Sequence, residues 1–147
     1  MYRIADDRYA SDLNGTGGLY GPGRWHRRGI QILYLTEHIS LAKLETLANS
    51  PGLPQGRVLV TVHLPSDFSM TVVESAVLPE GWQNWPYLEE LADITERWIS
   101  EQKFWIMRVP SAQSPTEFNY LLNPLHPEHK TLQLVSVESH PFDPRLK

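Results

Sequence analysis

The chain has 147 residues, a formal net charge of −4 at pH 7 and no cysteine. This length suits a single domain over residues 1–147 with its own core, and the lack of cysteine excludes disulfides and thiolate metal sites. The negative charge argues against broad nucleic-acid binding. Without a signal peptide or an apolar run of roughly 18 residues, we expect a soluble, cytoplasmic protein.

Apolar periodicity and turn residues divide the chain into strands, helices and loops. In chain order we expect a strand at 2–5, a loop at 6–29, a strand at 30–36, a helix at 39–50, strands at 57–65 and 70–75, an aromatic loop at 78–86, a helix at 87–102, a strand at 104–111, a helix over 114–123 and a strand at 131–139. Because strands and helices are mixed without strict β–α–β alternation, the predicted fold class is α+β (mixed α/β).

Two of the expected helices have recognisable first residues. Ser40 is available as the N-cap of the helix at 39–50. Ser114 is followed by Pro115 and then by Glu117, which is the pattern of a capping box with proline at the first helical position. The pattern therefore predicts that a helix begins directly after Ser114.

The segment GGLYGPGRWHRRG at 17–29 combines glycine and proline with Arg24, Arg27 and Arg28. Glycine lets the backbone turn or approach another group closely, and arginine binds anions. The glycine spacing fits neither the dinucleotide fingerprint nor the P-loop, and a strand rather than a helix follows. The loop is either a solvated surface connection or an anion site of another kind.

Glu45 lies on the apolar side of the predicted helix. Leu41, Leu44 and Ala48 form one stripe at helical spacing, with Glu45 inside it and Lys43 and Thr46 on the opposite face. A carboxylate that faces the core is costly unless it is paired. Glu45 therefore forms a buried salt bridge, with Arg24 as a possible partner, or faces a cleft and does chemistry there.

Tyr34 shares one face of the strand at 30–36 with Ile30, Ile32 and Thr36. It is either a core aromatic or a site residue whose hydroxyl needs a partner. Arg24 precedes this strand and Glu45 follows it, so the three side chains can converge on one cleft.

Two further patterns give weaker evidence for a functional site. The histidines of HPEH at 126–129 are too few for a zinc site, so we expect no metal. Ser111, at a strand end, has no Gly-x-Ser-x-Gly turn around it, so it caps or orients another group rather than acting as a nucleophile.

The order and spacing of six motifs make the chain resemble the RES-domain toxins nearly from end to end. These motifs are GRW at 23–25, ILYLTE at 32–37, LAKLETLAN at 41–49, LPEGW at 78–82, RVPSA at 108–112 and EFNYLLNPLHP at 117–127. The chain departs from the family pattern at His26, where asparagine is common, and at Thr95, where glycine is usual.

The resemblance implies an ADP-ribosyltransferase-like fold that takes NAD as a substrate, without a bound cofactor. It also implies a bacterial toxin that forms a hetero-oligomer with an antitoxin carrying an Xre-type helix-turn-helix domain. By motif position the catalytic residues are Arg24, Tyr34, Glu45 and Ser111, and the substrate-binding residues are Arg24, Arg28, Tyr34, Asn119 and Asn123.

Chemistry assigns a role to each group. The arginines of the glycine loop, Arg27 included, would hold the pyrophosphate, Tyr34 would stack on a ring of NAD, and Ser111 would position its neighbours. Glu45 would stabilise the oxocarbenium-like centre formed when the nicotinamide–ribose bond breaks. We expect NAD degradation by hydrolysis or phosphorolysis. The alternatives are a protein ADP-ribosyltransferase, or a non-catalytic interaction module with a structural Arg24–Glu45 pair.

Overall fold

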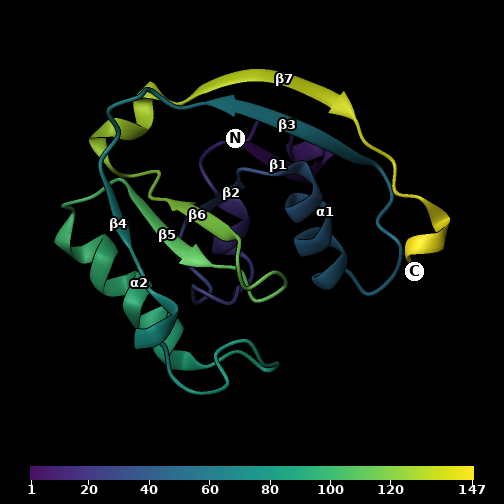
Figure 1. The fold of residues 1–147 in the computed structure, drawn as a ribbon. Coiled ribbons are helices and arrows are strands. Elements are labelled where there is room, and N and C mark those ends of the chain that lie inside the picture. Colours follow the sequence, from purple (N-terminus) through teal and green to yellow (C-terminus); the bar gives the residue numbers. More distant parts are fainter.

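The computed structural model describes all 147 residues and contains one seven-stranded sheet, with strand order β4-β5-β6-β2-β1-β3-β7 (Figure 1). The strands are β1 Tyr2–Asp6, β2 Leu33–Thr36, β3 Arg57–His63, β4 Met70–Val72, β5 Ile106–Pro110, β6 Phe118–Leu122 and β7 Gln133–Ser139, and the helices are α1 Ile39–Ala48 and α2 Glu89–Glu101. All neighbouring strands are antiparallel except β4 and β5. The α+β class is confirmed.

The strand register separates a cleft face from a core face. Tyr34 of β2 is paired with Leu121 of β6, and Thr36 with Asn119. Directly paired residues point to the same side of a sheet, so these four side chains lie on one face. Their neighbours along the strands point to the other face.

The core face is apolar, and the sheet curls around it. Its buried cluster contains Ala10, Leu33, Leu35, Val58, Val60, Val62, Trp105, Ile106, Tyr120 and Leu122. The valines of β3 pack in one cluster with side chains of β5 and β6, although these strands are not neighbours in the sheet. Figure 1 shows the long β3 and β7 arching over β5 and β6. This burial is the main apolar contribution to the fold.

Both helices cover the cleft face, over different strands. The buried side chains of α2 pack with Met107, Val109 and Leu121, which lie on the same face as Tyr34. Helix α1 contacts β1 and β2 instead. In Figure 1 the two helices stand apart, with the irregular segment between β4 and α2 running below them. The space between the helices is where a cleft can form.

The helix predicted over 114–123 is wrong, because residues 118–122 form the strand β6. Glu117 N donates to Ser114 O at 2.9 Å, so the capping-box residues form only a turn. Ser111 N donates to Glu117 O at 2.9 Å and closes the loop between β5 and β6. Strand β6 is paired on both edges, with β5 and with β2, and these ladders outweigh the local helix signal.

The remaining predicted elements are confirmed with smaller differences. Only Leu33–Thr36 of the predicted strand at 30–36 is paired. Helix α1 begins at Ile39 after an extended His38, so Ser40 is not its N-cap. Neither helix has the length and apolar character needed to cross a membrane.

Candidate active site

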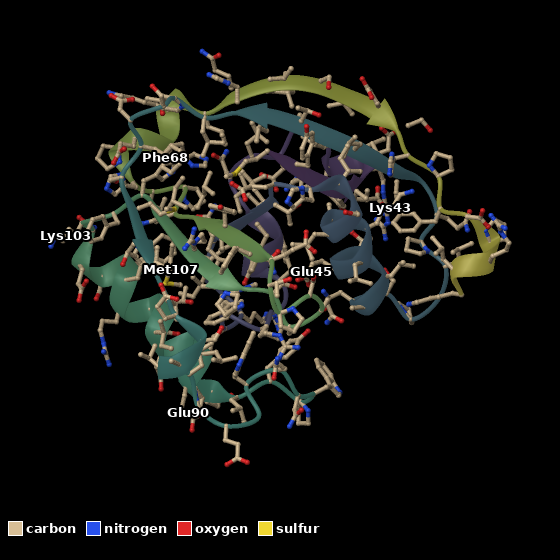
Figure 2. All side chains as sticks on the ribbon, in the orientation of Figure 1. Lys43, Glu45, Phe68, Glu90, Lys103 and Met107 are labelled. Atoms are coloured by element: carbon tan, nitrogen blue, oxygen red, sulfur yellow. The ribbon has the colours of Figure 1, made fainter.

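A cavity of about 980 Å³ lies on the cleft face, between α1 and the segment that precedes α2. Its lining includes Tyr34, Thr36 and Asn119 from the sheet and Glu45 from α1. Figure 2 places Glu45 between α1 and the loop that joins β5 to β6, with Lys43 on the far side of the helix. Glu45 therefore faces the cavity, as one of the two sequence-based alternatives requires.

The face of α1 toward the cavity differs from the predicted apolar stripe. Ala42, Glu45, Thr46 and Asn49 line the cavity, whereas the side chain of Leu44 is 41% exposed. Thr46 thus shares the face of Glu45 rather than lying opposite it. The reason is that α1 rests on the sheet mainly through Leu41 and Ala42, which are its buried residues. With Leu41 and Ala42 against the sheet, Leu44 lies on the side exposed to solvent, and Glu45 and Thr46 lie on the side that faces the cavity.

The carboxylate of Glu45 is held by two donors on the same oxygen. Ser111 Oγ donates to Glu45 Oε1 at 2.8 Å, and Asn119 Nδ2 donates to it at 2.6 Å. Hydrogen bonds to a charged acceptor are stronger than neutral ones, so these two fix the orientation of the carboxylate. Glu45 Oε2 receives no hydrogen bond from the protein.

Ser111 is completely buried directly after β5. Its Oγ accepts hydrogen bonds from Gln113 N at 3.1 Å and Ser114 N at 3.2 Å, and it donates to Glu45. With its proton directed to a carboxylate, this hydroxyl orients Glu45. The sequence-based expectation that Ser111 orients another group matches this geometry.

Arg24 lines the cavity but forms no ion pair with Glu45 within 4.0 Å. Its Nη1 donates to Trp82 O at 2.6 Å and to Asn84 O at 3.1 Å, and its guanidinium lies 4.6 Å from the ring centroid of Tyr87. Arg24 therefore fastens the irregular segment before α2 across one side of the cavity. Desolvation by burial lowers the pKa of Arg24 from its usual value.

Tyr34, which lines the cavity, is paired with His26 behind it in the glycine loop. Tyr34 Oη and His26 Nδ1 are 2.7 Å apart, and His26 Nε2 lies 3.2 Å from Gly21 O. A carbonyl oxygen can only accept, so Nε2 carries the proton of the neutral ring and Nδ1 accepts from the tyrosine. Burial lowers the pKa of His26 and raises that of Tyr34 above its usual range, which keeps both groups uncharged.

The glycine loop is packed tightly onto His26. A Cβ atom at Gly23 would lie 2.6 Å from His26 Cε1, and one at Gly18 would collide with the carbonyl of Ile30. Glycine is required at both positions because backbone and ring leave no room for a side chain. The loop is thus a packed support for His26 and Tyr34, not a freely solvated connection.

Two arginines of the predicted anion site and one further predicted substrate-binding residue lie away from the cavity. Arg27 binds Glu89, Asp93 and Glu96 of α2 at 2.8–2.9 Å, and Arg28 is exposed and does not line the cavity. Asn123 is buried, and its Oδ1 accepts from Leu125 N at 3.0 Å to stabilise a turn. The structure therefore brings together Arg24, Tyr34, Glu45, Ser111 and Asn119, but not Arg27, Arg28 or Asn123.

Sequence reasoning missed two residues of the cavity. Arg3 of β1 lines it, and the Arg3 Nε atom is buried without a hydrogen-bond partner. Tyr87 lines it too and donates from Oη to Asn49 Oδ1 at 2.9 Å. The arginine in the short strand YRIA was a usable signal, because a charged residue in a strand next to apolar ones needs a partner or a ligand.

Comparison with known proteins gives relatives that match along the whole chain. The Prs ADP-ribosylating toxin of Sphingobium sp. (strain YBL2) is 36% identical over 153 residues, covering 99% of this chain and 95% of the relative. Toxin Res of Yersinia enterocolitica is 36% identical over 152 residues, covering 100% and 99%.

A solved structure, the MbcT–MbcA toxin–antitoxin complex of M. tuberculosis, matches with a TM-score of 0.70 at 16% identity, covering 99% of this chain and 84% of that chain. This similarity concerns the fold. The model of the RES domain matches residues 1–143. With that match and the identities above, the chain belongs to the RES domain family.

Proposed function

We propose that this chain is the toxin of a bacterial toxin–antitoxin pair and that it cleaves NAD at the bond between nicotinamide and ribose. The observation that carries the proposal is the carboxylate of Glu45, which is fixed through Oε1 by Ser111 and Asn119 and lines a cavity of about 980 Å³. A cavity of this size suits a ligand the size of a nucleotide.

The reaction needs little more than this arrangement. When the glycosidic bond breaks, nicotinamide leaves with the bonding electron pair and positive charge develops on the ribose. A carboxylate held in advance at that position stabilises the charge without reorganisation during the reaction. An acceptor then adds to the ribose carbon. Water gives ADP-ribose and releases a proton to the solvent, whereas the phosphate dianion adds through a charged oxygen and gives the phosphate ester of ADP-ribose at the same carbon.

Charged and aromatic groups around Glu45 fit the rest of the substrate. Arg24 lines the cavity and stays charged at neutral pH, so it is the candidate for holding the phosphates. The ring of Tyr34 is fixed through its hydroxyl by His26 and can stack on a base. Cytoplasmic NAD would be the substrate pool.

A second function, ADP-ribosylation of a protein, is favoured by one observation. The Sphingobium relative is named for that activity on Prs and is 36% identical over nearly the entire chain. The two functions share the bond cleavage and differ only in the acceptor. A non-catalytic module with a structural Arg24–Glu45 pair has less support, since Arg24 contacts two carbonyls of the segment before α2 instead.

The test is incubation of the purified protein with NAD, with and without inorganic phosphate, while nicotinamide release is followed. Glu45→Gln is the inactive control. Mass spectrometry of the products separates ADP-ribose, its phosphate and a modified protein. If the wild-type protein releases no nicotinamide under any of these conditions, cleavage of NAD is refuted.

We further propose that an antitoxin with an Xre-type helix-turn-helix domain blocks the cavity. The support is that the solved structure with the same fold is a toxin bound to its antitoxin. Co-expression of such an antitoxin should restore growth of cells that produce this chain. Growth that is unaffected by either protein would contradict both halves of this proposal.

A further inference from the structure

The side chain of Tyr34 lies between two cavities. It lines the cavity that contains Glu45 and also a second cavity, of about 680 Å³, which is lined in large part by the glycine loop. His26 lines the second cavity only. Because the tyrosine ring borders open space in two places, it is held by fewer packing contacts than a core side chain. Its orientation therefore depends more on the hydrogen bond at its hydroxyl.

The imidazole of His26 is enclosed, so that only Nδ1 meets Tyr34. A Cβ atom at Gly23 would lie 2.8 Å from Nδ1, and one at Gly18 would lie 3.3 Å from Nε2, so loop backbone lies against both edges of the ring. Nε2 lies 3.2 Å from Gly21 O, and Nδ1 lies 2.7 Å from Tyr34 Oη. The imidazole is therefore fixed in one orientation, with Nδ1 toward the tyrosine.

The hydrogen bond between the two residues depends on a neutral imidazole. Nε2 donates to the carbonyl of Gly21, so Nδ1 of the neutral ring accepts the hydroxyl proton of Tyr34. His26 Nδ1 is the only acceptor for that proton. When the ring takes up a proton, Nδ1 becomes a donor, and the hydroxyl proton of Tyr34 loses its acceptor. The pair is therefore satisfied only while His26 is uncharged.

The surroundings of His26 favour its neutral form. No carboxylate lies within 4.0 Å of its ring. Of its neighbours in the loop, Arg24 donates to two backbone carbonyls of the segment before α2, and Arg27 binds carboxylates of α2. Burial lowers the pKa of His26, against the opposite effect of its hydrogen bond with Gly21 O. The imidazole is therefore uncharged at neutral pH.

The other titratable groups around the pair are engaged elsewhere or act on Tyr34. Asp12 and Arg3 line the second cavity, where Asp12 accepts hydrogen bonds from the backbone of its own loop and Arg3 donates to a backbone carbonyl. Burial raises the pKa of Tyr34, and Tyr87 and Glu45 add to that rise. Among all these groups, only the histidine ordinarily changes its charge between about pH 5 and about pH 7.5.

We propose that His26 is a positioning residue for the reaction: Nδ1 of its neutral ring accepts from Tyr34 Oη and fixes the tyrosine ring as a wall against which the substrate binds. The proposal rests on the proposed function. His26 does not line the cavity that contains Glu45, so it acts through Tyr34 and not on the bond that breaks. Its effect therefore falls on KM for NAD more than on kcat, and acid removes it.

Two substitutions of His26 give a matched test. Asparagine places its Oδ1 where Nδ1 of the histidine lies, so His26→Asn keeps an acceptor for Tyr34 and cannot take up a proton. Glutamine places its amide one bond further out, near the position of Nε2, so His26→Gln leaves the tyrosine hydroxyl without an acceptor. Tyr34→Phe removes the donor of the same bond. His63→Asn is the control, because His63 is exposed and lines neither cavity.

The measurements are KM and kcat for NAD between about pH 7.5 and about pH 5. At pH 7.5 we expect His26→Gln and Tyr34→Phe to raise KM about fivefold, the effect of one hydrogen bond of ordinary net strength, and His26→Asn to change it less than about twofold. The double variant with His26→Gln and Tyr34→Phe should bind no more weakly than either single variant, because His26 acts through Tyr34.

The pH dependence separates this role from a merely structural one. In the wild type and in the His63→Asn control, KM should rise as the pH falls through the pKa of His26, which an NMR titration of its ring measures directly. In the His26→Asn protein this rise should be absent. The proposal is overturned if His26→Asn and His26→Gln have the same KM, or if the rise at acid pH persists in His26→Asn.

Two further measurements keep the test decisive. If a variant of His26 fails to fold, ¹⁵N NMR of the wild type decides: Nδ1 must be the unprotonated nitrogen at pH 7.5, and its resonance must shift in the Tyr34→Phe protein. A wild type that releases no nicotinamide refutes NAD cleavage instead. The same variants are then compared by calorimetric binding of NAD, where weaker binding by His26→Gln but not by His26→Asn supports the positioning role and equal binding refutes it.

Discussion

Replacement of Glu45 by glutamine should abolish activity while leaving the fold intact. Glutamine keeps the volume, and its carbonyl oxygen can still accept from Ser111 Oγ and Asn119 Nδ2, which lie 2.8 and 2.6 Å from Glu45 Oε1. The free energy of unfolding should therefore change by less than about 1.5 kcal/mol, the net worth of one hydrogen bond. Loss of the charge that faces the cavity should reduce kcat about 100- to 1000-fold.

Glu45→Ala separates the two effects. It leaves the donors of Ser111, which is completely buried, and Asn119, which is 8% exposed, without their acceptor. An unsatisfied buried donor costs about 1–3 kcal/mol, so the alanine variant should lose roughly 2–6 kcal/mol if no water enters. Nicotinamide release and urea unfolding of both variants check this. A glutamine variant as unstable as the alanine variant, or one that retains wild-type kcat, would refute the reasoning.

Four further outcomes follow from other contacts. Burial lowers the pKa of His26 and His129 below 6.5, so the unfolded chain takes up protons at a higher pH than the folded chain does. The free energy of unfolding should therefore fall as the pH drops below about 6.5. Equal urea midpoints at about pH 7.5 and about pH 5.5 would contradict this. Arg24→Lys replaces the planar guanidinium, which lies over the ring of Tyr87 and donates from Nη1 to Trp82 O and Asn84 O, so it should raise KM for NAD and expose the segment before α2 to limited proteolysis; an uncleaved segment with unchanged KM would show that the planar group is dispensable. Arg27→Ala leaves three carboxylates of α2 without their shared cation and should lower the Tm, less so in high salt; a Tm drop independent of salt would point to packing instead. Antitoxin binding measured by calorimetry should weaken with NAD present and with Arg24→Ala, whereas equal affinity in all cases would place the partner elsewhere.

Sequence periodicity was sufficient to predict the elements whose conformation follows from their own apolar pattern. The alternating valines of β3 and the apolar side of α2 predicted both elements, since each buries a continuous face against the sheet. The convergence of Arg24, Tyr34 and Glu45 on one cavity also followed from their order around one strand and one helix.

The sequence-based predictions were wrong where contacts with residues distant in the chain determine the structure. Strand β6 has a helix-start sequence before it, yet its ladders with β2 and β5 determine its conformation. Arg27 looked like part of an anion site because its carboxylate partners lie 62 or more residues away, on α2. The face that α1 turns to the cavity, with Leu44 exposed and Thr46 in the lining, depends on how the helix packs on β1 and β2, and no pattern within the helix predicts it.

The close packing of the glycine loop has a consequence for genetic work on this chain. A side chain at Gly18 or Gly23 would displace Ile30 or His26, and with them the support of Tyr34, although neither glycine takes part in the chemistry. A screen for cells that survive expression should therefore recover escape mutants at these glycines as readily as at Glu45. A map of such mutants therefore marks all residues that maintain the cleft. Activity assays on purified, folded variants are needed to distinguish the residues that take part in the reaction from those that hold them in place.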